Sequence, residues 1–453
     1  MKRSSVLLAA SLALASLLAG CSTAPTDSER AARDQIAQLA PAYPKSGSAG
    51  ELPPLAPGAP LEDYLRFGVL NHPRVAAAWH DWRASVESIA IARSLPDPQL
   101  TFEADIMDTL MTFMPGLMFD VMARGKRTAM ADEAAARSGV AYRTYVSAVL
   151  RTAVEVRKAW TELAYADDVR RLYEATIRNV DQSVAVAGTE FSTGRGMVSF
   201  EQLVRFQNLS AEHHAHHAAI GDRLVAARAR FKSALGIART DADPPWPEPA
   251  LSITALPSEN ELWHHATSAN PELASMRAMV DMAVAEVAVA ERARTPDVGL
   301  GLMVDVKSSP LMFRPTASIG LPIWRDKIAA GIAAAEARRD AARARVDVMQ
   351  LDLAAELAQM LFMVREADRM IAYIDRTALP NIRRVLASAE AGYQSAMGTA
   401  AMIPEARHME LTMQLERVNA LRERELAAAD LLVLFAGRIP AGAPLLAETS
   451  PSS

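Results

Sequence analysis

The 453-residue chain has a single cysteine, few aromatic side chains (6%) and a formal net charge of -5. One thiol can form neither an intramolecular disulfide nor a cysteine-based zinc site. A chain without surplus positive charge is a poor match for nucleic acid, whose binding rests on Lys and Arg contacts to phosphate. The sequence also lacks a phosphate-binding loop, a Ser/His/Asp arrangement and a Cys/His zinc set. It therefore indicates a protein that is neither an enzyme nor a cofactor carrier.

Long apolar runs are scarce as well. Beyond residue 20 there is no stretch of about 18 uncharged apolar residues, the length that suggests a transmembrane helix. If the chain crosses a membrane, it must do so as strands. Alanine, interspersed with charged residues, is abundant instead. Half of the residues are apolar (50%) but few are aromatic, a composition typical of long helices packed on one another.

The position of the one cysteine has an explanation in the residues before it. Two basic residues precede an apolar run over residues 6–18, which predicts a secretory signal peptide over residues 1–20. Leu18-Ala19-Gly20-Cys21 resembles the bacterial lipoprotein box, in which the cysteine is acylated. Ser22 stands where lipoproteins kept at the inner membrane usually carry Asp, so the resemblance implies a lipid anchor in the outer membrane. The alternative is a plain signal peptide with an incidental cysteine.

Proline marks the ends and the middle of the mature chain. Residues 21–60 are predicted to be a flexible, lipid-anchored tether, and residues 439–453 a disordered tail. Between them the chain repeats itself with an offset of about 200 residues, which predicts two structural repeats over 61–237 and 258–438 and a proline-rich joint over 238–257. The repeated landmarks are Asn71-His72-Pro73 and Asn270-Pro271, Arg124-Gly125-Lys126 and Arg325-Asp326-Lys327, Phe191–Gly196 and Tyr393–Gly398, and Leu235-Gly236 and Ala436-Gly437.

Each repeat shows the same order of expected elements. A helix comes first, about 61–94 and 259–293, and two short alternating segments follow. A very long helix comes next, about 127–188 and 328–394, and then a turn and a last helix. Apolar residues in the first long helix recur at steps of four and three, which is a coiled-coil seam. The seam consists of Val149, Ala153, Val156, Trp160 and Leu163. Pro380 predicts a kink in the second long helix, at the proline or just before it.

The alternating segments predict two β-hairpins, about 98–123 and 297–324. In the second hairpin, apolar residues occupy one face of 297–307 and polar or small residues the other. Such strands suit a membrane β-barrel, and the alternative is a half-buried sheet in a soluble protein. Four strands cannot close a useful barrel, so membrane crossing requires several chains. Lys126, Trp324 and Lys327 stand where strands meet helices and are expected at the membrane interface.

Taken together, these features resemble the TolC family of outer-membrane factors, in its lipoprotein branch. The likeness rests on the duplicated order of elements, on Leu321-Pro322-Ile323-Trp324 at the end of the fourth strand, on Leu379-Pro380, and on Gly196 and Gly398 at two hairpin tips. The resemblance implies a mainly α fold with a small β part. Long antiparallel coiled-coil helices would form a periplasmic α-barrel, and four strands per chain would contribute to a trimeric 12-stranded transmembrane β-barrel. It also implies a homotrimer that meets outer-membrane lipid and docks on a periplasmic adaptor and an inner-membrane pump.

The tips are the expected docking surface for the adaptor. In the first tip, Gly194 and Gly196 supply the turn, and Ser199 with Gln202 fits a capping box for the next helix. In the second tip, the predicted docking residues are Gly398, Pro404, Glu405 and Arg407. Family members that resemble TolC itself carry acidic residues soon after the second glycine, and Pro404 and Arg407 occupy those places here. An acidic gate is therefore not carried over.

Two clusters bear on the cargo. His213 and His217 lie one helical turn apart, the spacing of helical metal-binding pairs, although a solvated helix face is the more common reason for such a cluster. Methionines near the hairpins could serve as soft ligands or simply fill gaps. They are Met107, Met111, Met114, Met118, Met122, Met303 and Met312. The sequence thus favours a passive outer-membrane efflux conduit, with heavy-metal cations as the preferred specific cargo. The alternative is a lipid-anchored periplasmic scaffold or adaptor without a pore.

Overall fold

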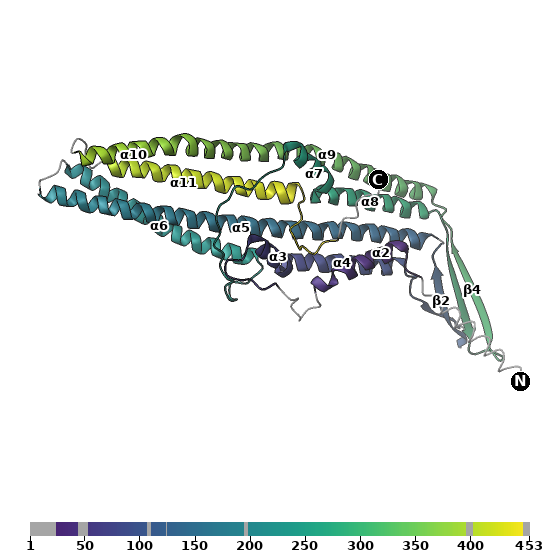
Figure 1. Cartoon of the computed structure of the whole chain (residues 1–453). Coiled ribbons are helices and arrows are strands. Elements are labelled where there is room, and N and C mark those ends of the chain that lie inside the picture. The colour runs from purple at the N-terminus through teal and green to yellow at the C-terminus, as the bar shows by residue number, and fades with distance from the viewer. Residues whose placement is uncertain are drawn as a thin grey trace.

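The computed structural model describes residues 24–43, 53–106, 110–123, 125–193, 198–395 and 402–446. Two groups of long helices run side by side along an elongated body, and a four-stranded sheet projects from one end of it (Figure 1). The hairpins α5–α6 and α10–α11 reach the opposite end. The prediction of a mainly α fold with long helices and a small antiparallel sheet is confirmed.

Both repeats have the same order of elements. The first consists of α3 (Leu61–Asn71), α4 (Pro73–Arg93), β1 (Gln99–Ile106), β2 (Leu110–Val121), α5 (Lys126–Thr193) and α6 (Phe200–Ala234). The second consists of α7 (Glu259–Ala269), α8 (Pro271–Arg292), β3 (Asp297–Asp305), β4 (Met312–Gly320), α9 (Arg325–Tyr373), α10 (Leu379–Gln394) and α11 (Met402–Ala429). Short π-helical turns, Ile374–Ala378 and Asp430–Phe435, follow α9 and α11.

The first helix of each repeat differs from its prediction, because a proline divides it in two. α3 ends at Asn71 and α4 begins at Pro73, and α7 and α8 are divided in the same way at Asn270. A proline inside a helix removes a backbone donor and clashes with the preceding turn, but it fits well at the first position of a new helix. The side chain of Asn270 caps α8 by accepting hydrogen bonds from two backbone N–H groups, at 2.9 Å each.

The long helices are built around buried seams. α5 has 68 residues and is therefore about 100 Å long at 1.5 Å per residue. Four of the five predicted seam residues, all except Trp160, are buried in it. In the second repeat, the π-helical turn Ile374–Ala378 lies directly before Pro380. The hydrogen bonding is thus irregular just before the proline, which cannot supply the backbone donor that a regular α-helical turn requires, and the kink itself stays a prediction.

The sheet is antiparallel throughout, in the order β1-β2-β3-β4. The second hairpin begins at residue 297 as predicted, but it ends earlier, because β4 is Met312–Gly320 and the predicted hairpin extends to 324. The alternation in β3 is clear: Leu302 is 48% exposed, whereas Met303 on the other face is 8% exposed. Gly299 and Gly301 make room on that second face for the side chains of Ser318 and Thr316. One face of the projecting sheet is therefore apolar and open.

The N-terminal segment is the clearest difference from the sequence prediction. The expected flexible tether contains a helix, α2 (Asp27–Leu39), followed by a 3-10 turn (Ala40–Ala42). α2 packs on α4 and α5, where its Glu29 carboxylate is fully buried between Arg33 and Arg93. The prolines around the segment suggested a tether, but residues 27–39 contain none and begin with a capping Thr26 side chain.

The proline-rich joint is also tied down. The backbone N–H of Thr254 donates to Glu425 Oε1 in α11 at 2.9 Å, and Arg157 in α5 donates to the Thr254 hydroxyl at 2.8 Å. The joint therefore holds the two repeats together as it passes from one to the other (Figure 1). Within the described parts of the chain, no helix has both the length and the apolarity that a membrane span requires.

Candidate functional site

The first hairpin tip has the cap that the sequence predicts. The Ser199 hydroxyl accepts from the backbone N–H of Gln202 at 3.2 Å, and the Gln202 side chain accepts from the backbone N–H of Ser199 at 3.0 Å. This reciprocal pair starts α6 at Phe200. Gly194 and Gly196 lie outside the residues that the structure describes.

The second tip is fastened by charge. α11 begins at Met402, so Pro404 is its third residue, and the Pro404 side chain is buried. Arg407 pairs with Glu390 of α10 at 2.9 Å, which ties the two helices of this hairpin to each other near the tip. Glu405 follows in the first turn of α11, where an acidic side chain is favourable for the helix dipole. Gly398 lies outside the described residues.

Several contacts join the two hairpins within one chain, and three of them lie at successive levels toward the tips. Arg422 of α11 donates to Glu162 of α5 at 2.8 Å. Nearer the tip, a ring nitrogen of His213 in α6 lies 3.3 Å from one of His408 in α11. Nearest the tip, the Tyr393 hydroxyl of α10 donates to Glu190 of α5 at 2.8 Å. These pairs are separated by 195 to 260 residues in the sequence, so no local pattern could have revealed them.

The first of these contacts is part of a larger cluster. The guanidinium groups of Arg223 and Arg422 both lie over the Tyr165 ring, 4.5 Å and 5.3 Å from its centroid. Glu162 accepts from both arginines, although its 3.5 Å contact with Arg223 is long. Cation–π contacts and a shared carboxylate thus connect α5, α6 and α11 at one level of the body.

The predicted metal pair, His213 and His217, has separate partners. His213 faces His408, whereas His217 Nε2 lies 3.4 Å from Glu174 Oε1 of α5. His213 is 2% exposed, and burial lowers its pKa from the ordinary value of 6.5, with a smaller contribution from the nearby His408. Among the described residues, no group of three or more His, Cys, Asp or Glu side chains could hold a metal ion.

The methionines divide between the interior and the surface of the sheet. Met114 and Met303 are buried, and the Met303 side chain lies over Gly116, its partner in the neighbouring strand. Met312 is exposed. Met107 lies outside the described residues, and so does the side chain of Met111. Two of the thioethers therefore fill space within the sheet, as gap-filling methionines do.

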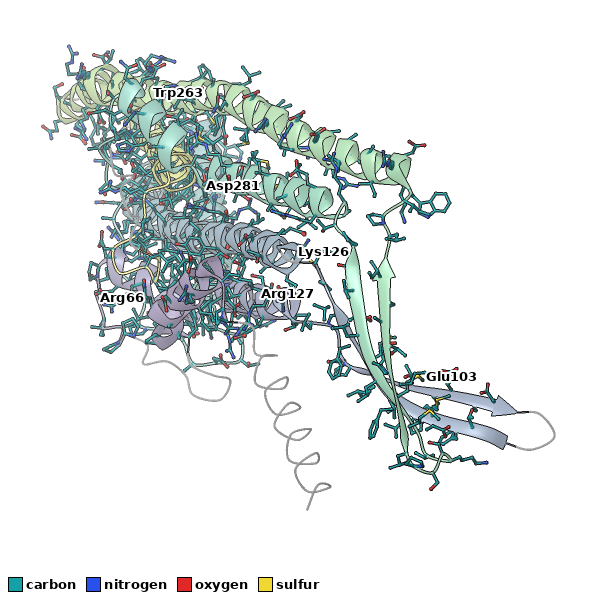
Figure 2. All side chains as sticks on the ribbon, turned by 90° about the vertical axis from the view of Figure 1, so that its right-hand side faces the viewer. Arg66, Glu103, Lys126, Arg127, Trp263 and Asp281 are labelled. Carbon is teal, nitrogen blue, oxygen red and sulfur yellow. The ribbon has the colours of Figure 1, made fainter. Side chains whose placement is uncertain are left out.

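The junction between sheet and helices is held by an ion pair. The Lys126 ammonium group at the start of α5 lies 2.5 Å from Asp297 Oδ2 at the start of β3, and the backbone N–H of Ala123 donates to Asp297 Oδ1 at 3.0 Å. Figure 2 shows Lys126 at the end of the helical body beside the strands, and Glu103 far out on them. Lys126 therefore connects the two repeats at the base of the sheet, in addition to its predicted position at the membrane interface.

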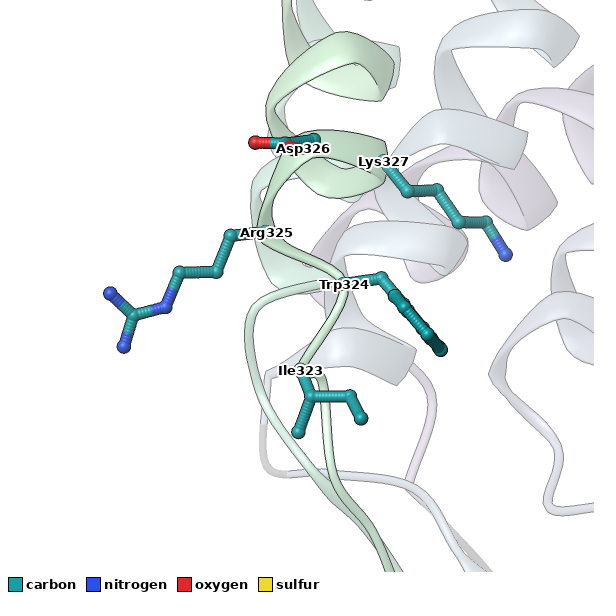
Figure 3. Close-up of a pocket in the computed structure, with 5 residues that line it drawn as sticks. All are labelled: Ile323, Trp324, Arg325, Asp326 and Lys327. Atoms are coloured by element: carbon teal, nitrogen blue, oxygen red, sulfur yellow. The ribbon is translucent and has the colours of Figure 1, made fainter.

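Trp324 and its neighbours form an open hollow where β4 leads into α9. Trp324 is 71% exposed, and the hollow has a volume of about 570 Å³ and is lined by residues 323–327. Figure 3 shows the Trp324 and Lys327 side chains pointing to one side and Arg325 to the other. The first turn of α9 has no side-chain cap. An exposed indole next to basic side chains is the pattern expected at a membrane interface, and this assignment stays a prediction.

Known proteins match this architecture over most of its length. The family model described as "outer membrane efflux protein" matches residues 69–236 and 262–437. Among solved structures, the outer membrane protein VceC from Vibrio cholerae has a TM-score of 0.67 at 18% identity, covering 83% of this chain and 96% of its own. CusC has a TM-score of 0.71 at 16% identity, covering 87% and 95%.

The open-state outer membrane channel MtrE from Neisseria gonorrhoeae has a TM-score of 0.69 at 15% identity, covering 84% of this chain and 89% of its own. No curated protein sequence matches the chain. At these identities the solved structures show a shared fold. The family model covers well over half of the chain, in two blocks that coincide with the two repeats. The chain therefore belongs to the outer membrane efflux protein family.

Proposed function

We propose that the chain is the outer-membrane channel of a tripartite efflux system, in which three copies form one conduit. The observation that carries this proposal is the projecting sheet. Its outer strands, β1 and β4, have no strand partner on their far sides among the described residues. Its open face carries Leu100, Phe102, Leu300, Leu302 and Ile319, all exposed. Free edges and an open apolar face are unfavourable in water, and both are covered when copies join edge to edge within lipid.

The helical body supports the same assembly. Large apolar side chains are exposed along α9, including Leu351 at 73%, and Val225 is exposed on α6. Large apolar side chains left exposed on helices of such a body favour an interface between copies. Three bodies about 100 Å long, side by side, would enclose a water-filled path through the periplasm. The channel itself supplies no energy, so transport would depend on a pump in the inner membrane.

Docking is proposed at the two hairpin tips, through Gly194, Gly196, Ser199, Gly398, Pro404, Glu405 and Arg407. The capping box fixes the start of α6 after the first tip, and the Arg407–Glu390 pair ties α11 to α10 beside the second, which supports docking of a periplasmic adaptor at this end. A lipid on Cys21 is proposed to add a second attachment to the outer membrane. The position of α2 supports this, because Ser28 in its first turn donates to Asp132 near the start of α5, close to the sheet.

The proposed cargo is a heavy-metal cation. The support is chemical: a histidine-rich segment of α6 and thioethers in the strands supply ligands that suit transition metals. The predicted pair of His213 and His217 stays part of this proposal, although each ring has another partner in the structure. A conduit must release what it binds, so any such site must be weak.

The test is to delete the gene and to measure survival on copper, silver, zinc and cobalt salts, beside detergents, dyes and antibiotics. Increased sensitivity to metal salts that the wild-type gene reverses is the expected result. Sensitivity to organic compounds alone would refute the metal cargo and leave the conduit standing. Unchanged tolerance of every compound, with the protein present as a soluble periplasmic species, would refute the conduit.

A further inference from the structure

Two histidines from different hairpins face each other inside the helical body. His213 Nε2 in α6 lies 3.3 Å from His408 Nδ1 in α11. The ring centroids are 5.5 Å apart, and the ring planes are within 21° of parallel. The distance between the ring centroids exceeds the distance between the facing nitrogens by about the width of one imidazole ring. This is possible only if both nitrogens lie near the line that joins the two centroids. Their lone-pair directions therefore converge on one point between α6 and α11.

The surroundings keep one member of this pair neutral and inaccessible. His213 is buried against the Tyr173 ring, whose centroid lies 6.0 Å from that of His213, and its other nitrogen, Nδ1, is buried without a hydrogen-bond partner among the described residues. His408 is only half-buried, so the pair is open to solvent from the α11 side. Neutral imidazole is the form that binds metal ions.

We propose that His213 and His408 form a two-imidazole binding site for a monovalent copper or silver ion. The inference deepens the proposed heavy-metal function and depends on it for its biological role. Zinc normally takes four ligands, and within the described chain no third His, Cys, Asp or Glu joins this pair. A monovalent d10 ion accepts two ligands in line, which is the arrangement that the rings present. With metal–nitrogen bonds of about 2 Å, an in-line ion needs a nitrogen separation of about 4 Å, so the rings must separate by less than 1 Å.

Binding of the ion at this site releases no proton to solvent. In the free protein one facing nitrogen carries a hydrogen and donates it to the other. Ion binding requires both facing nitrogens to be bare, and that hydrogen moves to the outer nitrogen of its own ring. For His213 the receiving atom is Nδ1, and for His408 it is Nε2. Both rings stay neutral, and the site gains the single charge of the ion.

The site has a structural consequence, because its two ligands belong to different repeats. An ion bound by both would join α6 to α11, at a level between the Glu162–Arg422 and Glu190–Tyr393 contacts. Two ligands make a weaker site than a full coordination sphere, which allows release. The i,i+4 neighbour His217 takes no part, since its ring faces Glu174.

The experiment uses the full-length protein purified in detergent and loaded anaerobically with one equivalent of Cu⁺ per chain. Absorption spectroscopy at the copper edge should show a first shell of two nitrogens. Titration with Ag⁺ should give a class of site whose affinity falls at least tenfold in His408→Asn. This variant keeps an amide group where His408 Nδ1 stood, so its contact with His213 can persist while the metal ligand is lost.

His264→Asn, at an exposed histidine of α7, is the control, and its Ag⁺ affinity should equal that of the wild-type protein. A first shell of sulfur would assign the ion to the methionines and overturn the site. Equal Ag⁺ affinity of His408→Asn and the wild-type protein would also overturn the site, provided that circular dichroism shows both proteins to be folded. If His408→Asn is misfolded, the copper-edge spectrum of the wild-type protein decides alone. Because binding is measured on purified protein, unchanged metal tolerance of the deletion strain would refute the cargo and not the site.

Discussion

The side-chain amide of Asn270 donates to the backbone carbonyl of Phe435 at 3.1 Å, and Asn71 makes the equivalent bond to the carbonyl of Leu235 at 3.0 Å. In both repeats the asparagine lies at the break between the two short helices, and the carbonyl lies at the end of the last helix. The glycine that follows each carbonyl-bearing segment has a positive φ, 73° at Gly236 and 64° at Gly437. Landmarks far apart in the sequence thus meet at one junction, and the duplication reproduces it.

Gly437→Ala should destabilise the protein. A Cβ atom at this position would lie 2.1 Å from the carbonyl oxygen of Ala269, and a positive φ is unfavourable for alanine. We expect a loss of about 2 kcal/mol or more and a lower melting temperature by circular dichroism. Gly331→Ala is the control, because that glycine lies in α9 with nothing near its missing Cβ, and alanine there should be neutral or stabilising. Equal melting temperatures for the two variants would show that the close approach of Gly437 to Ala269 does not matter for stability.

Much of this fold was predictable, because repeats and periodicity are local signals. The seam of α5 followed from its apolar spacing, and the sheet from alternation. Asn71 and Asn270 were recognised as repeated landmarks, but their function as fasteners was not, because the carbonyls that they bind lie 164 and 165 residues away. The same reason hid the contacts between hairpins. His213 was singled out by its helical spacing to His217, whereas its nearest polar partner in the structure is on another helix.

The α2 helix was missed for a different reason. Proline density around it predicted a tether, and averaging over residues 21–60 concealed a proline-free segment that begins with a capping threonine. A helix of 13 residues would be marginal alone, and its docking rests on tertiary contacts that the sequence does not announce. The buried Glu29 between two arginines is the main polar one.

Docking of α2 should depend on pH through Glu29. Burial alone would raise the pKa of Glu29, but the hydrogen bonds from Arg93 and Arg33 outweigh it and hold the pKa below the ordinary 4.5. A depressed carboxylate pKa stabilises the folded state above about pH 4.5, and this contribution is lost as the pH falls through the lower folded value. The protection factors of residues 27–39 against hydrogen exchange, corrected for the intrinsic pH dependence of exchange, should therefore fall at acid pH before those of the rest of the protein.

The Glu29→Gln variant tests the same ion pair at neutral pH. It leaves Arg93 beside a neutral group, at an expected cost of about 1–3 kcal/mol to the docked state. Asp34→Asn, on the exposed side of α2, is the matched control and should exchange like the wild-type protein. If both variants exchange alike, Glu29 does not hold the helix.

The two faces of β3 should differ in their access to water. Cysteines at Leu300 and Leu302 should react slowly with a membrane-impermeant thiol reagent in whole membranes, and cysteines at Met303 and Asp305 faster. The open apolar face of the sheet faces lipid in the proposed assembly, and the other face lines the conduit. Leu302→Arg should cost about 2–4 kcal/mol if the residue lies near the bilayer midplane. Equal labelling at all four positions would remove the membrane assignment.

Cys21→Ser should block lipid attachment. Five residues lie between Cys21 and the first residue of α2, and the first turn of α2 is held near the sheet by the 2.8 Å bond from Ser28 to Asp132. A lipid on Cys21 can therefore reach the membrane in which the strands are proposed to lie. The variant should carry no palmitate label and accumulate as precursor. Ser22→Asp is the matched variant: it should keep the label but hold the protein at the inner membrane on sucrose-gradient fractionation. Normal palmitate incorporation by Cys21→Ser would show that the lipoprotein box is incidental.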